Sequence, residues 1–258
     1  MPSYVITGAN RGLGYAFVQT AAKDPQNTII GLVRNKVEAD KKLAADGYKN
    51  VTFLQADITD RPALLAAREE AKKITGGRLD YLINNAALVQ SDEGKTLKDY
   101  ADEGDALEEK LLRTIRTNTV GLINAINAFL PLLQSGSKVL LISTGMADPD
   151  LVNYGGIADA PVYAISKAAA NMVIYKYNAT FKSQGILFFA VSPGVVATWE
   201  DGNEPPAIEN LRATAPNWTG PLTPTESATK VLGLLHDFSL EKGNGGAFVS
   251  HYGNKQWM

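Results

Sequence analysis

The chain has 258 residues, of which 25 are basic and 27 acidic, with no cysteine and two histidines. The missing cysteines exclude disulfides, thiolate catalysis and zinc–cysteine sites, and two histidines argue against a multi-histidine metal site or a serine–histidine triad. The balanced charge, without a basic block, argues against nucleic-acid binding. No apolar run of about 18 residues and no apolar leader is present, so we expect a cytoplasmic protein with no membrane partner and no bound metal.

Short apolar runs alternate with helical stretches along the whole chain. The runs are continuous rather than alternately apolar and polar, which is typical of parallel strands covered by helices on both faces. Strands that alternate with helices indicate βαβ units. The predicted strands cover residues 4–7, 28–33, 51–55, 81–84, 138–143, 186–192 and 246–250, and the predicted helices cover residues 14–22, 60–74, 107–133, 162–184 and 224–236.

These elements predict an α/β protein with one Rossmann-fold domain over residues 1–258, built on a doubly wound, mostly parallel seven-stranded sheet with helices on both faces. Asp60, and Thr223 with Glu226 three residues later, are typical residues at helix starts. Residues 197–225 are rich in Pro, Gly, Asn and Thr and have little periodicity. Long aperiodic loops are often functional, so we expect this segment to form a substrate lid.

A glycine-rich segment, TGANRGLG at residues 7–14, lies between the first predicted strand and the first predicted helix. Its spacing is GxxxGxG rather than GxGxxG. Glycines at this place allow a tight turn and let backbone N–H groups approach a pyrophosphate at a helix N-terminus. The segment predicts a dinucleotide site, and a glycine-rich turn without a ligand is the alternative.

Tyr163 and Lys167 lie four residues apart at the start of a predicted long helix. This spacing puts both side chains on one face of the helix, roughly 5–6 Å apart. A nearby ammonium favours phenolate over phenol, so we expect Lys167 to lower the pKa of Tyr163 and to make it an acid/base usable near neutral pH. The alternative is a surface Tyr–Lys pair without a catalytic role.

The chain resembles the short-chain dehydrogenase/reductase family over about residues 3–250. The resemblance rests on an ordered set of motifs: TGxxxGxG, Asn84-Asn85-Ala86 after the fourth strand, Asn118 in a long helix, a hydroxyl residue after the fifth strand, YxxxK, and Pro193-Gly194 after the sixth strand. Residues 118–120 and the ending at 248–257 are similar to C-signalling-factor-like carbonyl reductases, and fungal polyketide ketoreductases are also similar.

The resemblance implies roles for the catalytic residues. Tyr163 would protonate the developing alkoxide, and Lys167 would hold the ribose hydroxyls of the cofactor. Asn118 would keep a water in a proton relay behind Lys167. Thr144 stands at the position of the family's substrate-binding serine, and Ser143 is the second candidate for binding the carbonyl.

The resemblance also implies a set of cofactor-binding residues. The glycine-rich segment would wrap the phosphates, the residues after the third strand would contact adenine, those after the fourth would pack beside the ribose, and the PGxxxT stretch would hold the carboxamide. Besides Tyr163 and Lys167, the set is Gly8, Asn10, Arg11, Gly12, Leu13, Gly14, Arg34, Asp57, Ile58, Asn85, Ala86, Pro193, Gly194, Val196 and Thr198.

The end of the second predicted strand favours NADPH over NADH. An NAD-specific site places a carboxylate there, on the ribose hydroxyls. In this sequence Val33 stands at the position that the family's carboxylate would occupy, and Arg34 follows it. Arg34 and Arg11 can each offer paired N–H donors to a 2′-phosphate. The alternative is that Arg34 is solvated and Arg11 pairs with a nearby acid.

We therefore expect NADPH-dependent reduction of a ketone or aldehyde, a small-molecule substrate that could be aromatic or polyketide-like. NADP-dependent alcohol oxidation and a non-catalytic dinucleotide sensor are the alternatives. The resemblance leaves a homodimer, a homotetramer and a monomer open. The gap from Thr144 to Tyr163 is longer than is common in the family, and we expect it to form part of the pocket wall. The predicted substrate-lining residues are Met146, Tyr154, Trp199 and Trp218, with packing on the core as their alternative role.

Overall fold

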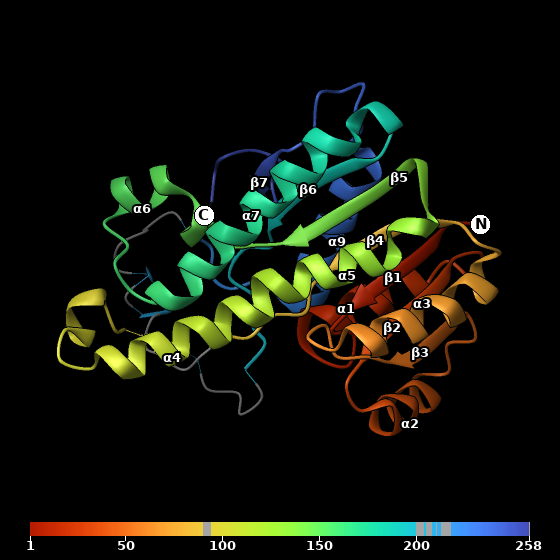
Figure 1. Cartoon of the computed structure of the whole chain (residues 1–258), viewed down its shortest axis with the longest axis horizontal. Coiled ribbons are helices and arrows are strands. Elements are labelled where there is room, and N and C mark those ends of the chain that lie inside the picture. The colour runs from red at the N-terminus through yellow and green to blue at the C-terminus, as the bar shows by residue number, and fades with distance from the viewer. Residues whose placement is uncertain (90–93, 200–203, 205–207, 210, 213–217, 258) are drawn as a thin grey trace.

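The computed structural model describes residues 1–89, 94–199, 204, 208–209, 211–212 and 218–257. Within these residues, seven parallel strands form one sheet in the order β3-β2-β1-β4-β5-β6-β7 (Figure 1). Each predicted strand is present, so the predicted α/β class and Rossmann fold are confirmed. The strands are β1 Ser3–Thr7, β2 Thr28–Val33, β3 Val51–Gln55, β4 Leu79–Asn84, β5 Leu133–Ile142, β6 Leu187–Ser192 and β7 Phe248–Ser250.

Helices cover both faces of the sheet. The described helices are α1 Gly12–Ala22, α2 Lys36–Asp46, α3 Arg61–Thr75, α4 Gly104–Ile115, α5 Gly121–Phe129, α6 Pro149–Gly155, α7 Pro161–Phe181 and α9 Pro224–Asp237. One core contains side chains of α1, α2 and α9, and a second core contains side chains of α3, α5 and α7. In Figure 1, α5 and α7 lie on the near side of the sheet.

The first strand shows why the strands are apolar on both sides. All five residues of β1 are buried. Tyr4 and Ile6 belong to the first core, whereas Val5 belongs to the second. Because side chains of a strand alternate between the two faces, a strand between two helical layers needs an apolar residue at nearly every position.

The helices differ from the prediction in three places. The predicted helix 107–133 is divided into α4, a π turn at Arg116–Val120, α5 and a short 3₁₀ turn, and Pro131 ends the helical path in that turn. The predictions did not include α2, which buries only Ala39 and so has no apolar period. Nor did they include α6, which begins at the cap Asp148 with Pro149 in its first turn. The caps Asp60 and Thr223 are confirmed.

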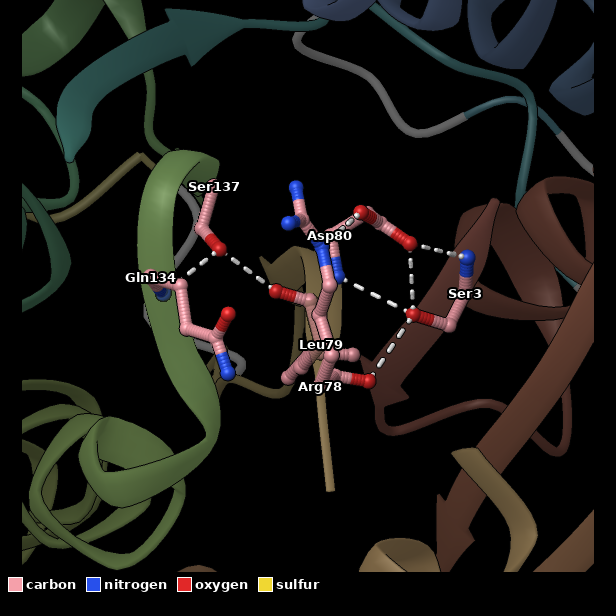
Figure 2. A network of polar contacts seen from close by, with 6 residues as sticks. All are labelled: Ser3, Arg78, Leu79, Asp80, Gln134 and Ser137. Carbon is pink, nitrogen blue, oxygen red and sulfur yellow. Dashed lines mark hydrogen bonds and ion pairs between the residues drawn. The ribbon is translucent and has the colours of Figure 1, made fainter. Parts of the chain in front are cut away.

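The amino ends of β1, β4 and β5 are joined by a polar network (Figure 2). The backbone N–H and the hydroxyl of Ser3 both donate to Asp80 Oδ2, at 2.9 Å. Arg78 Nε donates to Asp80 Oδ1 at 3.0 Å. Ser137 Oγ donates to the carbonyl oxygen of Leu79 at 2.6 Å. The network pairs polar side chains where three strands begin.

Much of the predicted lid lies outside the described residues, namely 200–203, 205–207, 210 and 213–217. The ends of the segment are close together, because Val196 and Leu222 form a parallel β-bridge. Among the described helices, none is long and apolar enough to cross a membrane.

Candidate active site

The glycine-rich segment joins β1 to α1 at the carboxyl edge of the sheet. Gly8 has φ +67° and Gly12 has φ +53°, in the region that favours glycine. A Cβ on Gly14 would lie 2.1 Å from the carbonyl oxygen of Gly8, so helix and strand could not pack as closely with any other residue. Arg11 precedes α1 and gives it no side-chain cap, which leaves backbone N–H donors for an anionic group. Of the other predicted residues here, Asn10 is exposed and Leu13 is buried.

Asn85 and Ala86 attach the glycine-rich segment to the end of β4. Asn85 Nδ2 donates to the carbonyl oxygens of Thr7, at 3.0 Å, and Gly8, at 3.3 Å. The hydroxyl of Thr7 accepts from the backbone N–H groups of Asn85 and Ala86, both at 3.0 Å. β1 and β4 are the neighbours between which the sheet order reverses. In Rossmann folds this switch point is the place where dinucleotides bind.

The residues predicted to contact adenosine follow β2 and β3 on the same edge. Val33 is 1% exposed, and Arg34 after it is exposed, so no carboxylate stands at the end of β2. Within the described part of the chain, Arg34 has no ion pair or hydrogen bond through its side chain. Asp57 Oδ1 accepts from the backbone and hydroxyl of Thr59, at 2.8 and 2.7 Å, which fixes the turn after β3. Ile58 is buried beside this turn.

Tyr163 and Lys167 lie on the face of α7 that covers the end of β5. Lys167 is 2% exposed, and its Nζ donates to the carbonyl oxygen of Ile142, the last residue of β5, at 2.7 Å. The same Nζ lies 5.9 Å from the centre of the Tyr163 ring. The structure therefore brings the two predicted residues together, on one helix face and at the carboxyl edge of the sheet.

Burial, rather than the charge of the lysine, dominates the proton affinities of this pair. Burial raises the pKa of Tyr163 to about 12 and lowers the pKa of Lys167 to about 8. The net shift is therefore opposite to the expected lowering, because burial outweighs any effect of Lys167, whose ammonium is directed at a carbonyl oxygen. Both side chains carry a proton at neutral pH, so Tyr163 can act as a proton donor.

Asn118 lies in the π turn between α4 and α5, and its side chain forms three hydrogen bonds. Asn118 Oδ1 accepts from the backbone N–H of Leu88 at 2.7 Å, and Nδ2 donates to the carbonyl oxygen of Leu88 at 3.0 Å and to Ser166 Oγ at 2.9 Å. Ser166 Oγ in turn donates to the carbonyl oxygen of Tyr163 at 2.7 Å. Asn118 thus links the segment after β4 to the start of α7. Its predicted part in a water relay stays a prediction.

The two hydroxyl residues after β5 have different surroundings. Ser143 is 2% exposed and donates to Asn171 Oδ1 at 2.7 Å, so its proton is already committed. Thr144 is half-buried and accepts from the backbone N–H of Met146 at 3.3 Å, so its own proton is available to an acceptor. This difference favours Thr144 as the group that binds a carbonyl oxygen. Asn171 was not predicted, although it lies one turn after Lys167 on the same helix.

The predicted PGxxxT stretch crosses from β6 toward the glycine-rich segment. A Cβ on Gly12 would lie 3.4 Å from Thr198 Cγ2, so the end of the stretch reaches the phosphate-binding candidate. Gly194 has φ +82°, and a Cβ there would lie 3.0 Å from the ring of His251. His251 is 7% exposed, and its Nδ1 has no hydrogen-bond partner among the described residues. His251 was not among the predicted site residues, although it is one of only two histidines and directly follows the last strand.

The predicted substrate-lining residues do not converge. Met146 lines a cavity of about 810 Å³ between α6, the start of α7 and residues 96–98. Tyr154 is 95% exposed near the end of α6 and does not line this cavity, although its neighbour Asn153 does. Its predicted contact with substrate gains no support from this cavity and stays a prediction. Trp199 and Trp218 are half-buried and are not among the residues that line this cavity.

Comparisons with known proteins agree with this geometry. Residues 3–207 match the family model described as short chain dehydrogenase. The chain is 45% identical to the short-chain dehydrogenase/reductase AacuF of Aspergillus aculeatus and 42% identical to the short chain dehydrogenase virK of Hypocrea virens, with 100% of both chains covered in each case. The matches with these relatives include the long segment between Thr144 and Tyr163 and the C-terminal end as well as the motifs.

Two solved structures show the same fold. The NADPH-bound carbonyl reductase from chicken fatty liver matches with a TM-score of 0.80, and the carbonyl reductase Sniffer of D. melanogaster with a TM-score of 0.79. Each is 24% identical, and each comparison covers 98% of both chains. The family match, the two relatives and the confirmed fold lead to one conclusion: this chain belongs to the short-chain dehydrogenase family of oxidoreductases.

Proposed function

We propose that the chain reduces a ketone or aldehyde to an alcohol with NADPH. The observation that carries the proposal is the placement of Tyr163, Lys167 and Thr144 at the carboxyl edge of the sheet, beside the glycine-rich segment. Lys167 is bonded to Ile142, two residues before Thr144. A proton donor, a buried cation and a hydroxyl donor are thus held on one side of the candidate dinucleotide site.

The chain's residues fit NADPH. The closely packed Gly8 and Gly14 leave no room for side chains between the first turn of α1 and β4, so backbone N–H groups can reach a pyrophosphate. Arg34 is exposed and without a side-chain partner in the described residues, and Val33 takes the place of a carboxylate. A guanidinium at that point favours a 2′-phosphate. The carbonyl reductase from chicken, which shares the fold, was solved with NADPH bound.

Three side chains would then each have a separate role in the reduction of a carbonyl. When bound, NADPH supplies the hydride. Thr144 donates a hydrogen bond to the carbonyl oxygen, on which negative charge develops. Tyr163, which keeps its proton at neutral pH, donates that proton to the oxygen. The buried ammonium of Lys167 stabilises the phenolate that remains.

The cavity beside Met146 supports a substrate with a bulky apolar part. Its lining is mainly apolar, with Val152, Ile157, Pro161 and Ala164 among the side chains. Met146 lies two residues after Thr144, so a substrate whose carbonyl is held by Thr144 would reach this cavity past Met146. An aromatic or polyketide-like ketone fits this setting better than a small polar aldehyde.

NADPH consumption with a panel of aromatic ketones, aliphatic ketones and aldehydes tests the proposal, with NADH as the matched cofactor. We expect NADPH to be preferred by at least about tenfold in kcat/KM, because a charged hydrogen bond contributes about 1.5–3 kcal/mol. Arg34→Ala should raise the KM for NADPH and leave NADH almost unchanged. If cofactor binds but no carbonyl is reduced and no alcohol is oxidised with NADP⁺, the chain is a dinucleotide sensor instead.

A further inference from the structure

The last described residues of the chain turn back from β7 toward the segment that follows β5. The N–H of Ser250 donates to the carbonyl oxygen of Asn254 at 2.7 Å, and the N–H of Gln256 donates to Asn254 Oδ1 at 2.8 Å. These bonds close a tight loop, and the last described residues lie near α6 (Figure 1). Residues that are more than a hundred positions apart in the sequence thereby come into contact.

The first contact is between Trp257 and Gly145. A Cβ on Gly145 would lie 3.3 Å from Cε3 of the Trp257 indole on one side and 2.9 Å from Leu151 Cδ2 on the other. The indole also packs on Phe248 of β7, with the ring centres 4.8 Å apart. Gly145 is therefore enclosed between the C-terminal segment and α6, and the indole is itself supported by the sheet.

The second contact is an ion pair between Lys255 and Asp148. The Asp148 side chain is 4% exposed, whereas that of Lys255 is 59% exposed. Asp148 Oδ1 also accepts from the N–H of Leu151 at 3.0 Å and so caps α6. A buried carboxylate that lost its ammonium would be left unpaired, at a cost in stability, so the pair holds the start of α6 to the C-terminal segment.

The 3₁₀ turn Gly145–Ala147 lies between these two contacts, and Thr144 is its N-cap residue. The N–H of Gly145 donates to Ser192 Oγ at 3.1 Å, which ties the turn to the end of β6. In the chain, Thr144 lies between the end of β5 at Ile142 and the start of this turn at Gly145. The orientation of its hydroxyl therefore depends on how firmly residues 145–148 are held.

We propose that Trp257 and Lys255 are positioning residues for the substrate carbonyl, because they hold the turn that carries Thr144. The proposal rests on the proposed function, in which Thr144 binds the carbonyl oxygen. Within the described residues, neither side chain forms a hydrogen bond or ion pair with Thr144 or Tyr163, and their contacts with residues 145–148 place their effect in the turn. A displacement of about 1 Å at a reacting group can reduce a rate by ~10²-fold, so loss of either contact is expected to affect the reaction far more than cofactor binding.

The test uses the full chain with Trp257→Ala, Trp257→Phe, Lys255→Met and Lys255→Arg. Lys242→Met is the matched control, because it removes the lysine of an exposed ion pair with Asp237, away from the turn. Carbonyl kinetics, NADPH dissociation constants and hydrogen exchange of the amides at 145–151 are measured for each variant. Hydrogen exchange reports on the turn even if no substrate is turned over, so the two proposals can fail separately.

We expect Trp257→Ala and Lys255→Met to lower kcat/KM for the carbonyl by about 10–100-fold, mainly in kcat, with NADPH affinity within about twofold of wild type. Exchange at 145–151 should accelerate by about tenfold or more, while β1 stays protected. Trp257→Phe, Lys255→Arg and Lys242→Met should stay close to wild type. Unchanged exchange in both disruptive variants would overturn the proposal, as would faster exchange with unchanged carbonyl kinetics, or an equal loss of NADPH affinity.

Discussion

Buried polar groups at the amino and carboxyl ends of the strands differ in their hydrogen bonding. At the amino ends of β1 and β4, the carboxylate of Asp80 is paired with Ser3 and Arg78 (Figure 2). At the carboxyl ends, Asn84 Oδ1, Asn171 Nδ2 and His251 Nδ1 are buried and have no hydrogen-bond partner among the described residues. Buried side-chain atoms without such a partner also occur elsewhere, at Thr20 Oγ1, Thr75 Oγ1 and Asn178 Oδ1, so the carboxyl end differs in holding three of them next to the candidate site.

A buried polar atom without a partner costs about 1–3 kcal/mol, so a ligand that bonded to the three atoms next to the candidate site would be stabilised there. They lie close to the residues that would contact a dinucleotide or a carbonyl, whereas the network of Ser3 and Asp80 faces no such site. We therefore expect the amino end to contribute mainly to stability and the carboxyl end, under the proposed function, to the reaction. Substitutions at the two ends should therefore separate activity from stability.

The largest effect is expected at Tyr163. Tyr163→Phe removes the proton donor and keeps the ring, so kcat should fall by about 10²–10⁴-fold while NADPH affinity and thermal stability stay close to wild type. Steady-state kinetics with the best carbonyl and fluorescence titration with NADPH measure both. Turnover near the wild-type rate would remove Tyr163 from the mechanism.

The next effect is expected at Thr144. Thr144→Val keeps the shape and removes one donor to the developing oxyanion, so kcat should fall by about 10²–10³-fold. Ser143→Ala is the matched control, because Ser143 donates to Asn171 rather than outward, and its loss should lower stability more than kcat. If kcat falls by about 10²-fold or more in Ser143→Ala but not in Thr144→Val, Ser143 rather than Thr144 binds the carbonyl oxygen.

The pH dependence should report Lys167. Burial lowers the pKa of Lys167 to about 8 and raises the pKa of Tyr163 to about 12. Lys167 loses its proton as the pH rises through its pKa, so kcat/KM should fall above about pH 8, by about tenfold one pH unit higher. A profile that stays flat to about pH 10 would show that the charge of Lys167 does not assist the reaction.

The smallest effect on activity is expected at Ser3. Ser3→Ala removes the hydroxyl bond to Asp80 and should lower the free energy of unfolding by about 1–3 kcal/mol, with kcat/KM unchanged. Burial acts to raise the pKa of Asp80, but the bonds from Ser3 and Arg78 outweigh it, and the pKa is lowered overall. This stabilisation is present above the unfolded-state pKa and is lost as the pH falls through the folded-state pKa, so wild type and variant should converge in acid. A changed kcat/KM in Ser3→Ala would contradict the expectation that the amino end of the sheet affects stability but not activity.

The fold could be predicted because both faces of the sheet are covered. A strand such as β1, with neighbours in two cores, needs a continuous apolar run, and that signal is visible in the sequence. The helix α2 could not be predicted in the same way, since it buries only Ala39. The π turn at Arg116–Val120 was also missed, because one additional residue in a turn leaves no mark in composition.

The placement of Tyr163 beside Lys167 could be predicted, because the two residues are four positions apart on one helix. The candidate site could not be predicted where contacts depend on tertiary structure. The contact of Trp257 with Gly145 joins positions that no periodicity relates. The direction of the pKa shift of Tyr163 also depends on burial, which the spacing of two residues does not reveal.

Isotope transfer tests the central claim most directly. Wild-type protein and Tyr163→Phe are incubated with NADPH that carries deuterium at both C4 positions and with the best carbonyl of the panel, and the alcohol is analysed by mass spectrometry over time. We predict one deuterium on the carbinol carbon with wild type, and formation of the same product at least about 100-fold more slowly with Tyr163→Phe. Alcohol without deuterium, or equal rates for the two proteins, would contradict NADPH-dependent reduction with Tyr163 as the proton donor.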